Sequence, residues 1–185
     1  ALLKIRQDEF EEASELLATL KNLDSKSLAV TAAQIQLNIR QGRKAEALRV
    51  SDEIVKSLNN ASAYILRART YTTLGQPGEA VKDLDHAISI EPDSIDVWIA
   101  RSDFYRSIGQ AQNASADIKQ ALSLKSDDIQ LQKRAILLFI ASGNHDMIQE
   151  GKALLEKALE SNPEDIQFRL FKSRLVLNEG TAPAI

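Results

Sequence analysis

Residues 61–94 of this chain of 185 residues read ASAYILRARTYTTLGQPGEAVKDLDHAISIEPDS. Apolar residues recur in this stretch at intervals of three and four, first before Gly75 and again after Pro77. This spacing predicts two amphipathic helices, because residues three and four apart share one face of a helix. Glycine is the usual residue at a helix end, and proline is tolerated in a first helical turn. The stretch therefore predicts a pair of helices joined by a short turn.

The same pattern recurs along the chain every 34 residues. The repeated positions are Gly75, Gly109 and Gly143; Tyr71, Tyr105 and Phe139; Ala80 and Ala114; and Ala87 and Ala121. Towards the N-terminus the interval becomes 33 residues, from Gly75 back to Gly42, and towards the C-terminus it becomes 37. A period of this length is typical of arrays in which each repeat stacks on the next.

The repeat divides the chain into units at 28–60, 61–94, 95–128 and 129–165, with partial units at 1–27 and 166–185. Each complete unit is expected to hold a first helix before its glycine and a second helix after it. First helices are expected near 28–41, 61–74, 95–108, 129–142 and 166–179, and second helices near 9–21, 44–58, 77–90, 111–124 and 146–161. The fourth unit holds three extra residues near His145, which should lengthen the start of its second helix or enlarge the turn.

Unit 61–94 resembles the tetratricopeptide repeat (TPR) family, with matching residues at eight positions: Tyr64, Ala68, Tyr71, Gly75, Ala80, Leu84, Ala87 and Pro92. Unit 95–128 matches at Trp98, Ser102, Tyr105, Gly109, Ala114, Ile118 and Ala121. The resemblance implies an all-α fold, a right-handed α-solenoid of antiparallel helix pairs with about four to five repeats. Both ends of the sequence fall inside a unit, so we expect a single solenoid that is a fragment of a longer array.

Composition argues against several classes of function. The chain has no cysteine, and its two histidines, His86 and His145, are far apart, so no metal-ligand or nucleophile pattern is present. The net charge of −3 does not favour nucleic-acid binding. No apolar run reaches the length of a membrane span. We therefore expect a protein that is not an enzyme, has no cofactor and does not insert into a membrane.

Two pairs of opposite charge recur at the same two positions of successive units. Arg67 and Asp83 form one pair and Arg101 and Asp117 the other, each 16 residues apart. In unit 129–165 both positions are apolar, so charge is kept or lost on both helices together. This pattern predicts structural ion pairs between the two helices of a unit, because an unpaired, partly buried charge is costly.

Charge also differs between the two sets of helices: the five first helices carry a net charge of +7 and the five second helices −7. The resemblance implies that first helices line the concave groove of the solenoid, so the groove is expected to be basic and its partner acidic. The Lys and Asn clamp of TPR domains that bind chaperone C-termini is absent. The residues expected to line the groove are Arg40, Ile65, Arg69, Ile99, Asp103, Arg106, Lys133, Arg134, Leu170 and Arg174.

The function expected from these observations is a non-catalytic scaffold that binds a segment of another protein in its groove. Two alternatives remain open at this point. One is a component of a bacterial envelope that exports polysaccharide or protein, and the other is a regulatory or substrate-presenting arm of a larger enzyme such as a glycosyltransferase. The absence of cysteine favours the periplasm or envelope over the cytoplasm.

Overall fold

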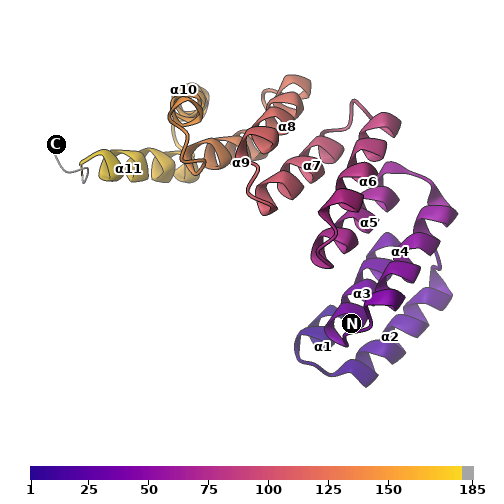
Figure 1. The fold of residues 1–185 in the computed structure, drawn as a ribbon. Helices are drawn as coiled ribbons and strands as arrows, with labels where there is room; N and C mark the ends of the chain where they lie inside the picture. Colours follow the sequence, from indigo (N-terminus) through magenta and orange to yellow (C-terminus); the bar gives the residue numbers. More distant parts are fainter. Residues whose placement is uncertain (181–185) are drawn as a thin grey trace. The chain divides into compact units, whose positions relative to one another are not determined.

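All the expected helices are present in the computed structural model, which describes residues 1–180 of the chain (Figure 1). Their ends lie within two residues of the expected positions. The first helices are α3 (Leu28–Arg40), α5 (Ala61–Thr73), α7 (Ile95–Ser107), α9 (Ile129–Ile140) and α11 (Ile166–Gly180). The second helices are α2 (Phe10–Leu23), α4 (Lys44–Leu58), α6 (Pro77–Ile90), α8 (Ala111–Leu124) and α10 (His145–Ser161), and a short helix α1 (Leu2–Arg6) precedes them. Residues 181–185, which follow the last expected first helix, lie outside the described residues.

The repeated glycines end the first helices by the mechanism expected from the sequence. Gly75 has a φ of +76°, and its counterparts at 42, 109 and 143 have φ values between +70° and +76°. At this turn the Gln76 N–H donates to the Tyr71 carbonyl at 2.9 Å, which satisfies a carbonyl that the helix leaves unpaired. The recurring glycine is thus a requirement of backbone conformation.

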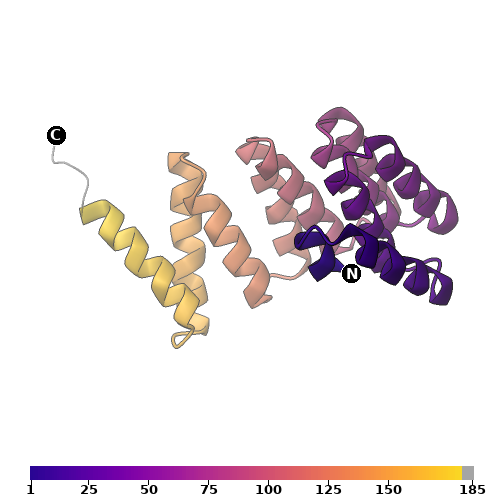
Figure 2. The same cartoon turned by 90° about the horizontal axis from the view of Figure 1, so that it is seen from below.

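The contacts divide the chain into two compact units, residues 1–104 and residues 105–185. In the first unit, α3 packs against α4 and α5 against α6, and these pairs lie side by side in Figures 1 and 2. First helices of successive pairs also contact each other, as α3 does with α5, and α1 contacts α3. Small and branched apolar residues fill these interfaces, for example Ala33, Leu17 and Leu37 where α2 meets α3.

In the second unit α9 packs against α8 and α10, and α11 packs against α10 and α9. Its core is formed by Ile136, Leu155, Ala158 and Phe168, all of them buried. Helix α10 has 17 residues, whereas α6 and α8 have 14 each, and it begins at His145, two residues after Gly143. The extra residues of this unit therefore lengthen the start of its second helix, as expected.

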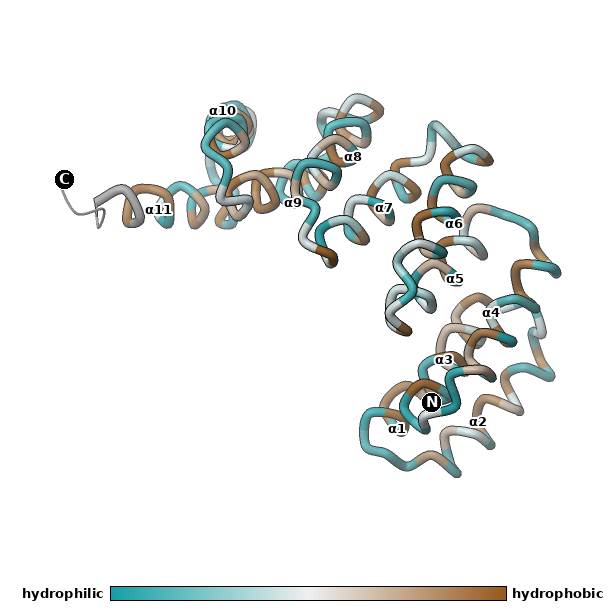
Figure 3. The backbone as a smooth tube through the Cα atoms, viewed as in Figure 1, coloured by the Kyte–Doolittle hydropathy of each residue, from teal (hydrophilic) through white to brown (hydrophobic). Residues whose placement is uncertain are grey.

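The hydropathy of the helices agrees with their packing. Figure 3 shows short hydrophobic and hydrophilic segments alternating along each helix, as expected when one face is buried and the other exposed. Over residues 1–180, no helix combines the length and the apolar composition that a membrane span requires.

Candidate functional site

The expected ion pair between Arg67 and Asp83 is confirmed, and it is part of a larger network. The Arg67 guanidinium donates to both carboxylate oxygens of Asp83, at 2.8 and 2.7 Å, and its third nitrogen donates to Asp52 on α4 at 2.9 Å. The guanidinium also lies over the rings of Tyr64 and Tyr71, 5.6 and 5.8 Å from their centres. These hydrogen bonds raise the pKa of Arg67, foremost the one to Asp83. The network joins α4, α5 and α6 and is structural.

Arg101 at the equivalent position of the next unit binds a carboxylate other than the one expected from the sequence. Its guanidinium pairs with Asp85 on α6 at 2.6 Å and lies 5.2 Å from the centre of the Trp98 ring. Asp117, the expected partner, belongs to the second compact unit. The pairing of Arg101 with Asp117 therefore stays a prediction.

Two of the basic residues expected to line the groove are held by carboxylates of the chain itself. Arg40 pairs with Asp8, which lies in the turn before α2. Lys133 donates to Asp165 at 2.7 Å and lies 5.2 Å from the centre of the Phe168 ring, with only 13% of its side chain exposed. Their charges are locally neutralised, so the net positive charge of the first helices overstates the charge available to a partner.

The other expected groove residues differ in exposure. Ile65 is 8% exposed and belongs to the core, while Ile99 and Asp103 are partly buried. Exposed side chains are those of Arg69, Arg106, Arg134, Leu170 and Arg174. Asp103, Arg106 and Arg134 have interaction partners of their own. Within residues 1–180, Arg69 on α5 and Arg174 on α11 are exposed and form no ion pair.

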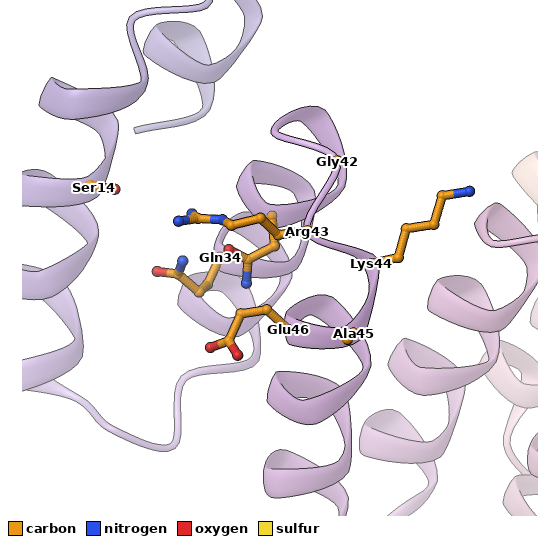
Figure 4. Close-up of a pocket in the computed structure, with 8 residues that line it drawn as sticks. Ser14, Gln34, Gly42, Arg43, Lys44, Ala45 and Glu46 are labelled. Atoms are coloured by element: carbon orange, nitrogen blue, oxygen red, sulfur yellow. The ribbon is translucent and has the colours of Figure 1, made fainter.

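A pocket of about 770 Å³ lies in the first unit, between α2, α3 and the start of α4 (Figure 4). Its lining residues are Ser14, Gln34, Asn38, Gly42, Arg43, Lys44, Ala45 and Glu46. In Figure 4 the side chains of Arg43, Gln34 and Glu46 extend toward the Ser14 side of the pocket, whereas Lys44 points away. Hydrogen bonds from Arg49 lower the pKa of the Glu46 carboxyl, so the rim holds a carboxylate as well as a guanidinium.

Asn38 is the most unusual residue of this pocket. Asn38 is only 1% exposed, and neither the nitrogen nor the oxygen of its side-chain amide has a hydrogen-bond partner. Its backbone is satisfied, since the Asn38 carbonyl accepts from the Arg43 N–H at 2.8 Å. Leaving a buried polar group unpaired costs about 1–3 kcal/mol, so such groups are rare in native proteins.

The repeat explains the open space in this unit. With the 33-residue register between units 28–60 and 61–94, Asn38 corresponds to Tyr71 and Gln34 to Arg67. In unit 61–94 these two side chains and the carboxylates bound to Arg67 occupy the space between α4 and α6. Shorter side chains stand at both positions of unit 28–60, and the corresponding space between α2 and α4 is open. The sequence carried this signal, because Asn38 stands where the three later units have aromatic residues.

The side chains in these sites form hydrogen bonds and ion pairs. Among residues 1–180, no group of three or more His, Asp or Glu side chains is arranged to hold a metal ion. The carboxylates of the Arg67 network are bound to a guanidinium, and the pocket combines amide, guanidinium and carboxylate groups. Such groups form directional hydrogen bonds to a polar ligand.

Comparisons with known proteins agree with the repeat. Family models described as tetratricopeptide repeat match residues 61–104 and residues 95–128. The comparison with curated proteins yields no match.

Three solved structures illustrate the likeness in fold. A thermophilic TPR protein of Thermus thermophilus is 21% identical, with a TM-score of 0.62 over 95% of this chain and 97% of that chain. A tetratricopeptide repeat protein of Parabacteroides merdae is 18% identical, with a TM-score of 0.60 over 96% of this chain and 70% of that chain. YrrB, described as a TPR protein with an unusual peptide-binding site, is 14% identical, with a TM-score of 0.54 over 92% of this chain and 87% of that chain. At these identities the likeness concerns the fold alone.

Proposed function

Because the chain belongs to the tetratricopeptide repeat family, we propose that it is a non-catalytic scaffold that holds a segment of a partner protein against its first helices. The observation that carries this proposal is the family itself, whose repeats form extended binding surfaces. A likeness in fold to YrrB, described as having a peptide-binding site, supports a peptide or protein segment as the partner.

The exposed first-helix residues indicate what the segment should contain. Arg69 in the first unit and Arg174 in the second are the cations best able to meet a partner, because Arg40 and Lys133 already bind carboxylates. Leu170 is 55% exposed and offers an apolar contact. We propose a segment that combines acidic and apolar residues and binds with moderate salt dependence, since screening weakens only the charged contacts.

The test begins with selection of binders from a displayed peptide library, followed by kinetic measurement with the best peptides. Arg69→Glu and Arg174→Glu should each slow association, because complementary charge acts mainly on the rate of encounter. Lys133 is unsuitable for this test, since reversing it would break its contact with Asp165.

A matched control is available on α6, where Glu79 and Lys82 form an exposed pair at 2.8 Å. The double variant Glu79→Lys/Lys82→Glu preserves the pair and the net charge, and it should leave the association rate unchanged. If this variant abolishes binding while Arg69→Glu and Arg174→Glu bind at the original rate, the second helices are the binding surface and the proposal is wrong.

A further inference from the structure

We propose that the pocket between α2, α3 and α4 is a binding site for a neutral carboxamide group, such as the side-chain amide of glutamine. This site goes beyond the proposed partner surface and does not depend on it. The proposal rests on the buried amide of Asn38, whose donor and acceptor are both unpaired, and on the pocket that Asn38 lines.

The hydrogen-bonding needs of Asn38 define the ligand. Its NH₂ group requires an acceptor, and its carbonyl oxygen requires a donor on the same side. A carboxamide presents a carbonyl oxygen and an NH₂ group side by side, so it can satisfy both atoms at once. A carboxylate offers only acceptors and an ammonium only donors, so either would leave one atom of Asn38 unpaired.

The rest of the pocket also suits a neutral polar group. Arg43 and Glu46 bring opposite charges to its rim, which gives no strong preference for an anion or a cation. Gln34 and Ser14 add further donors and acceptors. Because the Asn38 amide has almost no exposed surface, we expect an occupant to displace the exposed Arg43 side chain, which extends across the pocket (Figure 4).

The neighbouring unit provides an internal comparison. There Tyr71 and Arg67 occupy the corresponding positions, and the guanidinium makes its hydrogen bonds within the protein. A carboxamide bound in unit 28–60 would occupy the space that the side chains of Tyr71 and Arg67 fill in unit 61–94. The same carboxamide could belong to a free amino acid or to a residue within a peptide, and the experiment separates these two sources.

The experiment is a titration of the ¹⁵N-labelled chain followed by NMR, with the Asn38 side-chain NH₂ signals as the direct readout. Free L-glutamine and N-acetyl-L-glutamine methylamide represent the two sources, and the corresponding leucine and glutamate derivatives are controls. We expect at least one glutamine derivative to shift the Asn38 signals in a saturable manner, and the leucine and glutamate derivatives to shift them at least tenfold less.

Variants of the chain complete the test. Asn38→Leu keeps the branched shape of the side chain but removes the hydrogen-bonding groups, and Asn38→Tyr introduces an aromatic residue, as in the later units, to fill the pocket. Both should weaken glutamine binding at least tenfold, as measured through the backbone amide signals of the pocket residues, because the variants lack the Asn38 NH₂ group. Asn38→Tyr keeps the test valid if Asn38→Leu folds poorly. Lys56→Ala is the matched control, because this exposed residue of α4 does not line the pocket.

Two results would overturn the proposal: equal shifts with the leucine and glutamine derivatives, or unchanged glutamine binding by Asn38→Leu. The absence of any shift with all probes would mean that the pocket holds water only, which also overturns it. Arg69→Glu should leave carboxamide binding unchanged, so failure of this proposal can be distinguished from failure of the proposed function.

Discussion

Arg67 illustrates how one residue fixes the positions of three helices. Its guanidinium binds Asp83 on the following helix through two hydrogen bonds and Asp52 on the preceding second helix through one. Asp83 is 6% exposed, so these hydrogen bonds take the place of the water that burial removes from its carboxylate. A planar, five-donor group is suited to two carboxylates at once, and lysine could not replace it.

We predict that Asp83→Ala lowers the free energy of unfolding by about 2–3 kcal/mol, because the partly buried guanidinium loses its main partner and keeps only Asp52. The double variant Arg67→Ala/Asp83→Leu, which introduces the apolar pair of unit 129–165, should cost less than the single variant. Urea unfolding at neutral pH measures both.

The control for this prediction is Glu79→Ala, which removes one partner of an exposed ion pair on the same helix. Its effect should stay within about 0.5 kcal/mol, as is usual for surface pairs. Equal costs for Asp83→Ala and Glu79→Ala would show that burial adds nothing to the Arg67 network.

Asp165 provides a prediction about pH. The hydrogen bond from Lys133 and those from the backbone N–H groups of Phe168 and Gln167 lower the pKa of this carboxyl. Since the folded-state pKa lies below the unfolded one, the stabilisation is complete above about pH 4 and is lost as pH falls through the folded value. Asp165→Asn should therefore lower stability at about pH 6, and the difference between the two proteins should shrink as pH falls through the folded-state pKa of Asp165.

This comparison is made by urea unfolding of both proteins across the same acidic range. Asparagine keeps a side-chain oxygen that can accept hydrogen bonds from the N-terminus of α11. The variant therefore removes the charge of residue 165 but keeps its role as a helix cap. A difference between the two proteins that does not change with pH would mean that the carboxylate charge of Asp165 contributes nothing.

The sequence predicted the position of Arg67 and one of its partners, but other contacts depended on packing. Asp52 and Asp85 were missed because several carboxylates lie within reach of each arginine, and the choice among them is made by side-chain conformations in three dimensions. Lys133 was expected to line the groove, and its contact with Asp165 was missed for the same reason. The open space at Asn38 could be predicted from the sequence alone, because the later units have aromatic residues at the same position.

At the scale of the helices, the sequence predicted almost everything, because the repeated glycine and the apolar periodicity act locally. The sequence located the three extra residues of unit 129–165 to within a few positions, and they lengthen helix α10. What the sequence did not indicate is how closely α9 and α10 approach. A β-carbon added at Gly151 would lie 3.0 Å from the Phe139 β-carbon, so this glycine is required by contact rather than by φ.

Two glycines in second helices give a matched test of this explanation. Gly151→Ala should lower the free energy of unfolding by about 1–3 kcal/mol, because the added methyl group meets a β-carbon that is fixed to the backbone. Gly78→Ala on α6 meets nothing within 4 Å and should raise stability by about 0.5 kcal/mol through helix propensity.

Thermal and urea unfolding of both variants measure the difference. The opposite result would be that Gly151→Ala stabilises the protein, as Gly78→Ala is expected to do. That result would mean that α9 and α10 can move apart at no cost in stability, and that residue 151 need not be glycine.

For the whole molecule, the pattern of contacts matters more than any single residue. Within each compact unit, helices contact those next to them in the chain or the first helix of the adjacent pair. Repeat proteins with such contacts have stabilities that depend on each repeat and its neighbours, and they can open locally.

We predict that Leu155→Ala, which removes a side chain 2% exposed in the core of the second unit, destabilises α9–α11 by about 2–5 kcal/mol. Native-state hydrogen exchange should then show faster exchange in these helices and unchanged exchange in α3 and α5, because no core contact of Leu155 involves them. Leu37→Ala, at a fully buried site between α2 and α3, is the matched control and should give the opposite distribution. If either variant accelerates exchange equally in all helices, the chain opens only as a whole, and nearest-neighbour contacts do not set its local stability.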